Sequence, residues 1–170
     1  MLAALGKIAR AFAWLGGAGS LAVALMTLSS VVLRAATSKP IPGDVEITQM
    51  GIAIALSLCI PWCQLRGANI IVDFFTQSLT TRTHRLLDGV GCVLIALMYA
   101  VLAWRTSAGA WSVRAANETT MIIELPMWWV YAFLAPGLAL AAVIALAQAM
   151  HHFANQPANQ APRIEPEAIR

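Results

Sequence analysis

Four long stretches without charged residues dominate the sequence. They cover residues 11–33, 47–65, 86–104 and 125–150, and only Asp88 interrupts the third. A helix rises about 1.5 Å per residue, so about 20 residues cross a roughly 30 Å hydrocarbon core. Backbone groups in lipid must be bonded within their own segment, and none of these stretches alternates polar and apolar residues as a barrel strand does. The sequence therefore predicts an all-α membrane protein with transmembrane helices over about 11–33, 47–65, 86–104 and 127–150.

The composition excludes several classes of protein. Of the 170 residues, 59% are apolar and 11% are charged, and the mean hydropathy is +0.72. Soluble domains have about 45–50% apolar and about 25% charged residues. A soluble enzyme, a disordered chain and a nucleic-acid-binding domain are therefore excluded, and the net charge of +3 does not suggest a nucleic-acid partner.

The first stretch resembles a signal peptide only in the basic residues that precede it. Lys7 and Arg10 precede it, as in a charged n-region. A cleaved apolar region has about 7–15 residues, and no small-x-small cleavage site ends this longer one. We therefore expect a retained first helix.

Lys and Arg predict the orientation. With four spans, both termini and the loop between the second and third spans share one side. That side holds Lys7, Arg10, Arg66, Arg82, Arg85, Arg163 and Arg170, and the other holds Arg34, Lys39, Arg105 and Arg114. The larger number of Lys and Arg on the first side places both termini in the cytoplasm. The difference between the two sides becomes smaller when the residues of the distant tail are left out. Residues 1–152 are expected to form the membrane domain, and residues 153–170, which are rich in proline, a disordered cytoplasmic tail.

A short amphipathic segment is expected after the second span. Gly67 allows a turn or a helix end directly after Arg66. The apolar residues that follow at 70, 71, 74 and 75 fall on one helical face, so the segment can lie along the membrane interface. Arg66 and Asp73 bracket the turn. They either set the angle of the segment, by pairing with each other or with a partner, or meet only lipid phosphate and water.

Residue patterns for catalysis, cofactors or metals are not found, so no such site is predicted. Cys59 and Cys63 are four apart, whereas a redox pair is spaced C-x-x-C and a zinc site needs further ligands. No Lys, Arg or carboxylate lies near the centre of a span, where a transport path usually leaves one. The mid-span serines Ser29, Ser30 and Ser57 can bond within their own helices.

Small residues four apart mark three spans. The pairs are Gly16 with Ser20, Gly51 with Ala55, and Gly137 with Ala141. Such pairs allow close approach of two helices. They serve either internal packing or contact with a larger membrane partner.

The order of several motifs resembles a known family. The residues are, in chain order, Glu46; Arg66, Gly67, Asn69, Ile70, Val72 and Asp73; Leu79, Thr80 and Arg82; Asn117, Glu118, Thr119 and Thr120; Leu125, Pro126, Trp128, Trp129 and Tyr131; and Pro136 with Gly137. This pattern resembles the DctQ-type small membrane subunit of tripartite ATP-independent periplasmic (TRAP) transporters, over nearly the whole chain except the tail. The family often has His at the position of Asn69 and Pro at that of Thr80, which puts in question any role here of a titrating imidazole.

The resemblance implies a function. Such subunits pair with a large membrane permease subunit that holds the sodium and substrate sites, and a periplasmic substrate-binding protein delivers an organic acid. The small subunit is thought to extend the static scaffold around a moving transport domain in the inner membrane of bacteria or archaea. The motif positions that could face a partner are Glu46, Arg66, Gly67, Asn69, Asp73, Glu118, Pro126 and Trp128.

Two other classes remain open from the residues. A stand-alone four-helix transporter or assembly factor would work without a large partner. A small membrane redox or lipid-modifying enzyme would need Cys, His or carboxylate residues clustered at one membrane face, and the sequence has no such cluster.

Overall fold

Four long helices form the chain in the computed structural model, which describes residues 2–39, 41–67 and 81–153. They are α1 (Leu2–Thr37), α2 (Asp44–Leu65), α4 (Thr81–Ala115) and α5 (Trp128–Phe153). Each contains a stretch long and apolar enough to cross a membrane. The predicted all-α membrane fold with four spanning helices is confirmed. The amphipathic segment expected after the second span lies outside the described residues.

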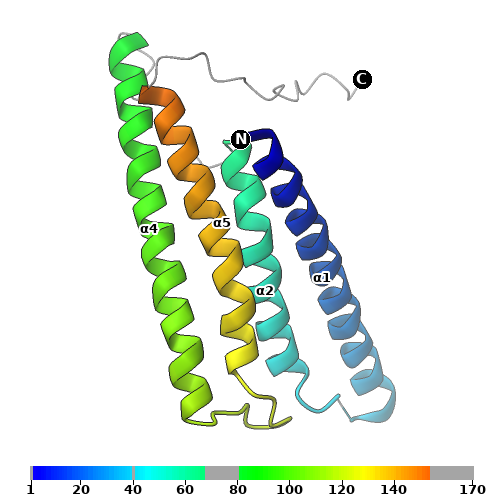
Figure 1. Ribbon diagram of the computed structural model, residues 1–170. Helices are drawn as coiled ribbons and strands as arrows, with labels where there is room; N and C mark the ends of the chain where they lie inside the picture. The colour runs from blue at the N-terminus through cyan, green and yellow to red at the C-terminus, as the bar shows by residue number, and fades with distance from the viewer. Residues whose placement is uncertain (1, 40, 68–80, 154–170) are drawn as a thin grey trace, which may run out of the picture.

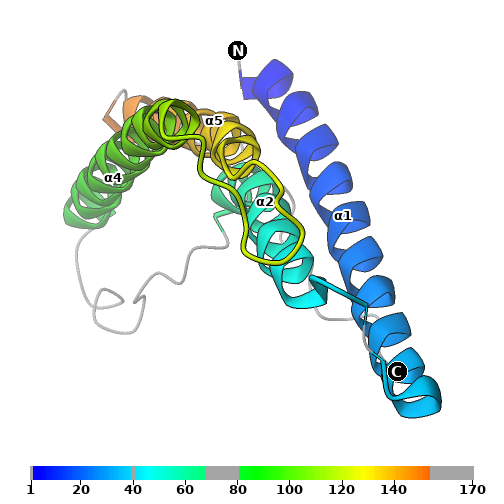
Figure 2. The ribbon, with the colours of Figure 1, turned by 90° about the horizontal axis from the view of Figure 1, so that it is seen from below.

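The helices stand in an open row, in the order α1, α2, α5, α4 (Figure 1). Helix α1 runs antiparallel to α2, and α4 runs antiparallel to α5, whereas the two central helices α2 and α5 run parallel to each other. Helix α1 therefore begins and α5 ends at one end of the molecule, here called the terminal end. The connections α1–α2 and α4–α5 lie at the other, here called the loop end. Seen from the loop end in Figure 2, α4 and α1 lie at opposite edges of the row, with α5 and α2 between them. Among the described helices, α2 and α5 are therefore the two that have a neighbour in the row on each side.

The two edge helices each bury one narrow seam with a seven-residue period. On α1 the less exposed positions include Leu5, Ala9, Phe12, Gly16, Gly19, Val23, Met26 and Ser30. On α4 they include Gly89, Cys92, Ala96, Tyr99, Ala103, Thr106, Ala110 and Val113. Alternating steps of three and four residues produce the side-by-side packing of a left-handed coiled coil. Most of the remaining circumference of each edge helix is apolar and exposed, and its exposed charged residues lie toward the helix ends.

Small residues set the α1–α2 spacing. A Cβ added at Gly16 would lie 2.7 Å from the carbonyl oxygen of Ala55 and 2.8 Å from Cys59 Sγ, and one at Gly51 would overlap the Val23 side chain. The predicted role of the first two small-residue pairs in helix approach is therefore confirmed for Gly16, Gly51 and Ala55. Ser20 is exposed.

The α2–α5 contact is built around a proline. Pro61 has no N–H, so the carbonyl of Ser57, one turn earlier in α2, lacks its usual helical partner. Gly137 faces that carbonyl so closely that an added Cβ would overlap it. Ser57 Oγ also donates to the carbonyl oxygen of Leu134 at 2.7 Å. A serine at this position can bond within its own helix, but Ser57 bonds across to α5, because the two backbones approach closely at Gly137.

Two glutamines complete this interface near the terminal end. Gln64 Nε2 donates to Gln148 Oε1 at 2.8 Å, and Gln148 Nε2 donates to the backbone carbonyl oxygen of Gln64 at 3.0 Å. Gln64 is only 3% exposed. The amide pair satisfies polar groups that would be costly to leave unpaired between apolar helices.

Candidate functional site

The predicted motif positions fall into two groups at opposite ends of the molecule. At the loop end lie Glu46, Glu118, Pro126 and Trp128, and at the terminal end lie Arg66 and Gly67. Asn69 and Asp73 lie outside the described residues, and so does any pairing of Asp73 with Arg66. Because Glu46 begins the second span and the other three flank the fourth, the fold brings together motifs that are far apart in the sequence.

The α4–α5 connection is an ordered hairpin-like loop. Helix α4 ends at Ala115, and Asn117 follows with a φ of 52°. The N–H of Asn117 donates to the Arg114 carbonyl at 3.2 Å, and the N–H of Glu118 donates to the Val113 carbonyl at 3.1 Å. This is the Schellman arrangement, which satisfies the last helical carbonyls. We refer to residues 118–127 as the outer loop, after the side that the Lys and Arg distribution predicts for it.

Backbone and side-chain bonds close the outer loop. Thr119 and Pro126 form an antiparallel bridge, the N–H of Thr120 donates to the Leu125 carbonyl at 3.0 Å, and that of Met127 donates to the Glu118 carbonyl at 3.1 Å. Thr120 Oγ1 accepts the Leu125 N–H at 3.1 Å. Glu118 and Pro126 thus act through the backbone, as parts of the loop's ladder.

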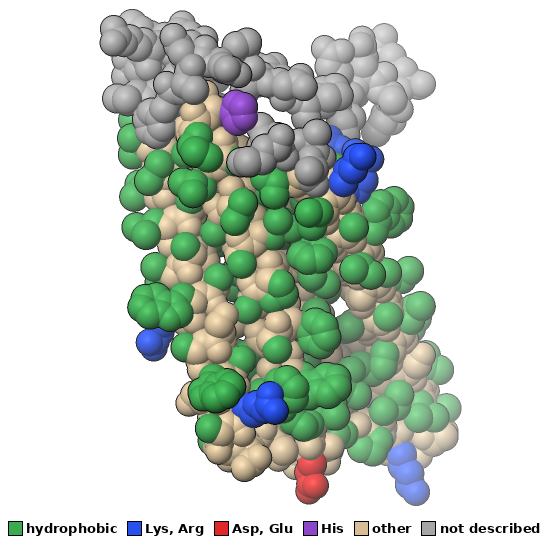
Figure 3. Space-filling model, in the orientation of Figure 1, with side chains coloured by type: hydrophobic (Ala, Val, Ile, Leu, Met, Phe, Trp, Pro, Cys, Tyr) green, Lys and Arg blue, Asp and Glu red, His purple; other side chains and the backbone are tan. Residues whose placement is uncertain are grey.

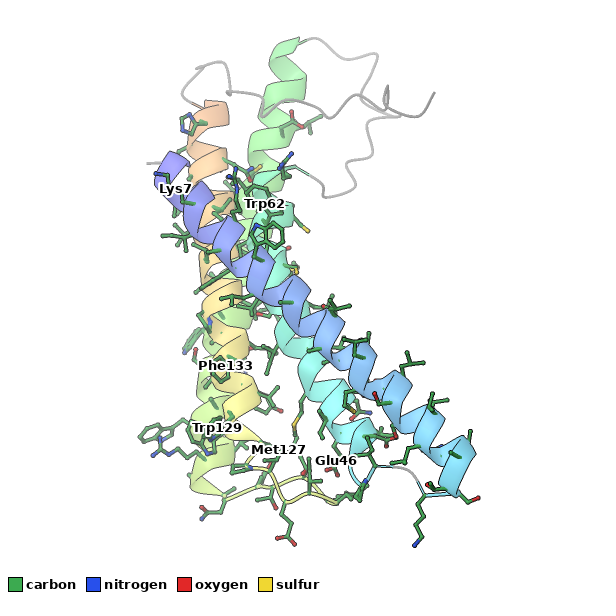
Figure 4. All side chains as sticks on the ribbon, turned by 90° about the vertical axis from the view of Figure 1, so that its right-hand side faces the viewer. Lys7, Glu46, Trp62, Met127, Trp129 and Phe133 are labelled. Atoms are coloured by element: carbon green, nitrogen blue, oxygen red, sulfur yellow. The ribbon has the colours of Figure 1, made fainter. Side chains whose placement is uncertain are left out.

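Glu46 fixes the tip of this loop to α2. Its Oε1 accepts the backbone N–H of Ile122 at 2.9 Å, and its Oε2 accepts that of Ile123 at 3.2 Å. Hydrogen bonds to an ionised carboxylate are the stronger kind. Figure 4 shows Glu46 at the loop end, close to the loop that leads to Met127. We call this the Glu46–loop contact.

Gly43 makes room for the same contact. It precedes α2 with a φ of 75°, a conformation that other residues rarely adopt. The Ile123 side chain fills the position that a Cβ of Gly43 would occupy. The outer loop therefore rests on the start of α2 through a carboxylate and an apolar contact together. Nothing in the sequence indicated this role for Gly43, apart from its position just before the acidic residues that begin α2.

A second carboxylate, missed by the sequence analysis, joins α1 to α2. Ser30 Oγ donates to Asp44 Oδ2 at 2.6 Å, and Arg34 Nη2 lies 3.4 Å from the same oxygen. Both mid-span serines of α1 can bond within the helix, and Ser29 does so, to the Leu25 carbonyl. Ser30 bonds to Asp44 instead. The acidic first turn of α2 thus contacts both flanking segments, with Asp44 toward α1 and Glu46 toward the outer loop.

Aromatic residues line the loop end of α5. Trp128 is the first residue of the helix, and its ring centroid lies 4.9 Å from the guanidinium carbon of Arg114. The ring centroids of Trp128 and Trp129 are 5.5 Å apart. Trp128, Trp129, Ala132 and Phe133 line a shallow apolar pocket. In Figure 4 Trp129 and Phe133 project from the same part of α5.

The terminal end gathers basic residues. Gly67 has a φ of 63° and ends α2, as the sequence predicts, with its N–H donating to the Gln64 carbonyl at 3.1 Å. The Arg66 guanidinium carbon lies 4.8 Å from the centroid of the Trp62 ring. Arg66 therefore stacks on its own helix, at the helix C-terminus where a cation is favoured.

The described residues offer the Glu46–loop contact and apolar surface rather than a reaction centre. Within residues 2–39, 41–67 and 81–153, no group of three His, Cys, Asp or Glu is placed to hold a metal ion. The arrangement can hold loops and present surfaces to lipid or to another protein.

Comparison with known proteins gives one match. The family model described as "Tripartite ATP-independent periplasmic transporters, DctQ component" matches residues 23–155. No curated protein and no solved structure matches the chain. The matched range includes α2, α4 and α5 in full and residues 23–37 of α1.

Proposed function

The chain belongs to the DctQ family of TRAP transporter components, and we propose that it is a membrane scaffold for the large permease subunit. It is a small permease subunit of a transporter, not an enzyme. Our proposal adds the finer roles: the complex takes up an organic acid, a sodium gradient drives the uptake, and a periplasmic substrate-binding protein delivers the acid.

The open row of helices carries the scaffold proposal. In the most apolar part of each span, only 11–33% of the residues are buried. Figure 3 shows apolar side chains across the middle of one face, with Lys and Arg near both ends. A four-helix transporter that acted alone would enclose a path between its helices, whereas a row leaves two broad faces. One face suits lipid and the other a large apolar partner.

Side chains within the spans fit the same role. The polar groups Ser57, Gln64 and Gln148 are used between α2 and α5. They hold the row together and leave the outward surfaces apolar. A static scaffold needs such cohesion, since it must resist the movement of a transport domain beside it.

The direct test is assembly followed by uptake. The chain, tagged and co-expressed with the large permease encoded beside it, should co-purify with that permease in mild detergent. Proteoliposomes holding both chains should accumulate a labelled organic acid only with the binding protein and an inward sodium gradient; dicarboxylates, keto acids and sialic acids form the panel. Vesicles that lack this chain should fall to background. Full uptake by the large subunit alone would refute the scaffold role, and uptake by this chain alone would support the stand-alone alternative.

Orientation in the bacterial inner membrane is a separate prediction. We expect the terminal end to face the cytoplasm, because Lys and Arg favour that side. Reporter fusions after residue 170 and next to Lys39 should then give opposite signals, cytoplasmic for the first and periplasmic for the second. A periplasmic C-terminus would reverse the placement of the outer loop and of every partner proposed for it.

A further inference from the structure

Two arginines from different helices meet on one indole ring at the terminal end. The guanidinium carbon of Arg66, just after α2, lies 4.8 Å from the centroid of the Trp62 ring. That of Arg10, in α1, lies 5.3 Å from the same centroid. The two cations are thus no more than about 10 Å apart. We call Arg10, Trp62 and Arg66 the arginine–tryptophan cluster.

The cluster carries positive charge that the described part of the chain does not neutralise. The ion pair found there, Arg34 with Asp44, lies at the loop end. Lys7 is exposed one turn before Arg10, and Figure 4 shows Lys7 and Trp62 near the same end of the row. A ring face attracts a cation but accepts few of the five N–H donors of each guanidinium. Those donors can therefore bind an anion from outside the chain.

The cluster also lies where lipid phosphates are. Trp62 is three residues before the end of α2, and the apolar span of α1 begins at Leu5. Gly6 approaches the Leu65 side chain, with 3.4 Å from an added Cβ, and Ala9 is completely buried. Packing of the two helix ends thus holds both arginines beside the ring before any ligand arrives, which lowers the entropy cost of binding.

We propose that the arginine–tryptophan cluster is a binding site for the phosphodiester headgroup of an anionic phospholipid. The guanidinium groups supply N–H donors and positive charge for the phosphate oxygens, and Lys7 adds charge at the rim. Phosphatidylglycerol fits this chemistry. Phosphatidylcholine carries its own cation, which the cluster repels. The loop end has no matching site among the described residues, since Arg34 is paired with Asp44 and Arg114 stacks alone on Trp128.

Lipid titration of the detergent-purified chain, read by native mass spectrometry, tests the proposal. Each basic residue near an anionic surface contributes about fivefold in affinity, so Arg10→Gln/Arg66→Gln should weaken phosphatidylglycerol binding by about 25-fold. Lys39→Gln, which removes one charge from the loop end, should leave it unchanged. Phosphatidylcholine should bind the wild-type and double-variant chains equally and weakly.

Further arms separate the possible explanations. Arg10→Lys/Arg66→Lys keeps the charge and should retain most of the binding, with circular dichroism confirming the helix content of every variant. Millimolar glycerol phosphate should not displace the lipid, because it lacks acyl chains; displacement would identify a free-phosphate site and overturn the lipid proposal. Unchanged phosphatidylglycerol binding by the double glutamine variant, or an equal loss in Lys39→Gln, would also overturn it.

Discussion

Gly137→Ala is expected to destabilise the protein, although replacing a helical glycine usually does the opposite. In a helix interior, Ala is favoured over Gly by about 0.5–1 kcal/mol. At Gly137 the added methyl group would overlap the backbone carbonyl of Ser57. A backbone atom cannot move aside as a flexible side chain can, so α2 and α5 must separate. Overpacking of this kind costs about 1–3 kcal/mol, which exceeds the helix gain.

Separation at Gly137 would also break neighbouring contacts. The Ser57–Leu134 hydrogen bond lies at the same crossing, and the Gln64–Gln148 pair depends on the same helix spacing. We therefore expect the midpoint of thermal unfolding in detergent to fall by several degrees, about 2–4 °C for each kcal/mol lost. The partly buried thiols of Cys59 and Cys92 allow unfolding to be followed with a thiol-reactive dye, once the exposed Cys63 has been replaced by serine.

Matched glycines supply the control. An added Cβ at Gly17 or at Gly91 meets no atom within 4 Å. Gly17→Ala and Gly91→Ala should therefore leave the midpoint unchanged or raise it slightly. Equal midpoints for Gly137→Ala and Gly17→Ala would contradict the close α2–α5 crossing.

The sequence predicts the helices well because their cause is local. Each of the four long stretches without charged residues predicts a membrane-spanning segment, and each is helical in the structure. The small residues at 16, 51 and 137 were correctly assigned to close packing. Their partners were not predictable, because a small-residue pair indicates close approach without naming the neighbour. The order of helices in the row depends on which helix surfaces fit together. One example is Gly137 of α5, which fits against the carbonyl of α2 that Pro61 leaves without its helical partner.

The residues of the candidate site were predictable from the sequence, but the contact between Glu46 and the outer loop was not. Glu46 and the segment around Glu118 and Pro126 were singled out separately as motifs. Their connection joins a carboxylate to backbone N–H groups at Ile122 and Ile123, which every residue but proline possesses, so side-chain chemistry gives no signal. The partners of the serines were not predictable either, because a hydroxyl bonds equally well within its own helix or to a neighbouring segment that comes close enough.

Glu46→Ala is expected to release the tip of the outer loop while leaving the four helices intact. The carboxylate receives two backbone N–H groups from the loop, and alanine offers no acceptor. The bridge between Thr119 and Pro126 lies within the loop and should persist. Because hydrogen bonds to charged groups are the stronger kind, exchange of the Ile122 and Ile123 amide hydrogens should become faster by about tenfold. Hydrogen–deuterium exchange of a peptide from residues 118–127 measures this directly.

Two further variants show whether the carboxylate itself holds the loop. Glu46→Gln keeps one oxygen that can accept a hydrogen bond and should give an intermediate exchange rate. Asp44→Asn alters the neighbouring carboxylate, whose partners are Ser30 and Arg34, and should leave the loop amides protected. If Asp44→Asn accelerated their exchange as much as Glu46→Ala, the loop would depend on the start of α2 in general. Uptake should be measured on the same variants. If Glu46→Ala gave fast exchange and normal uptake, the Glu46–loop contact would be a structural feature that transport does not require.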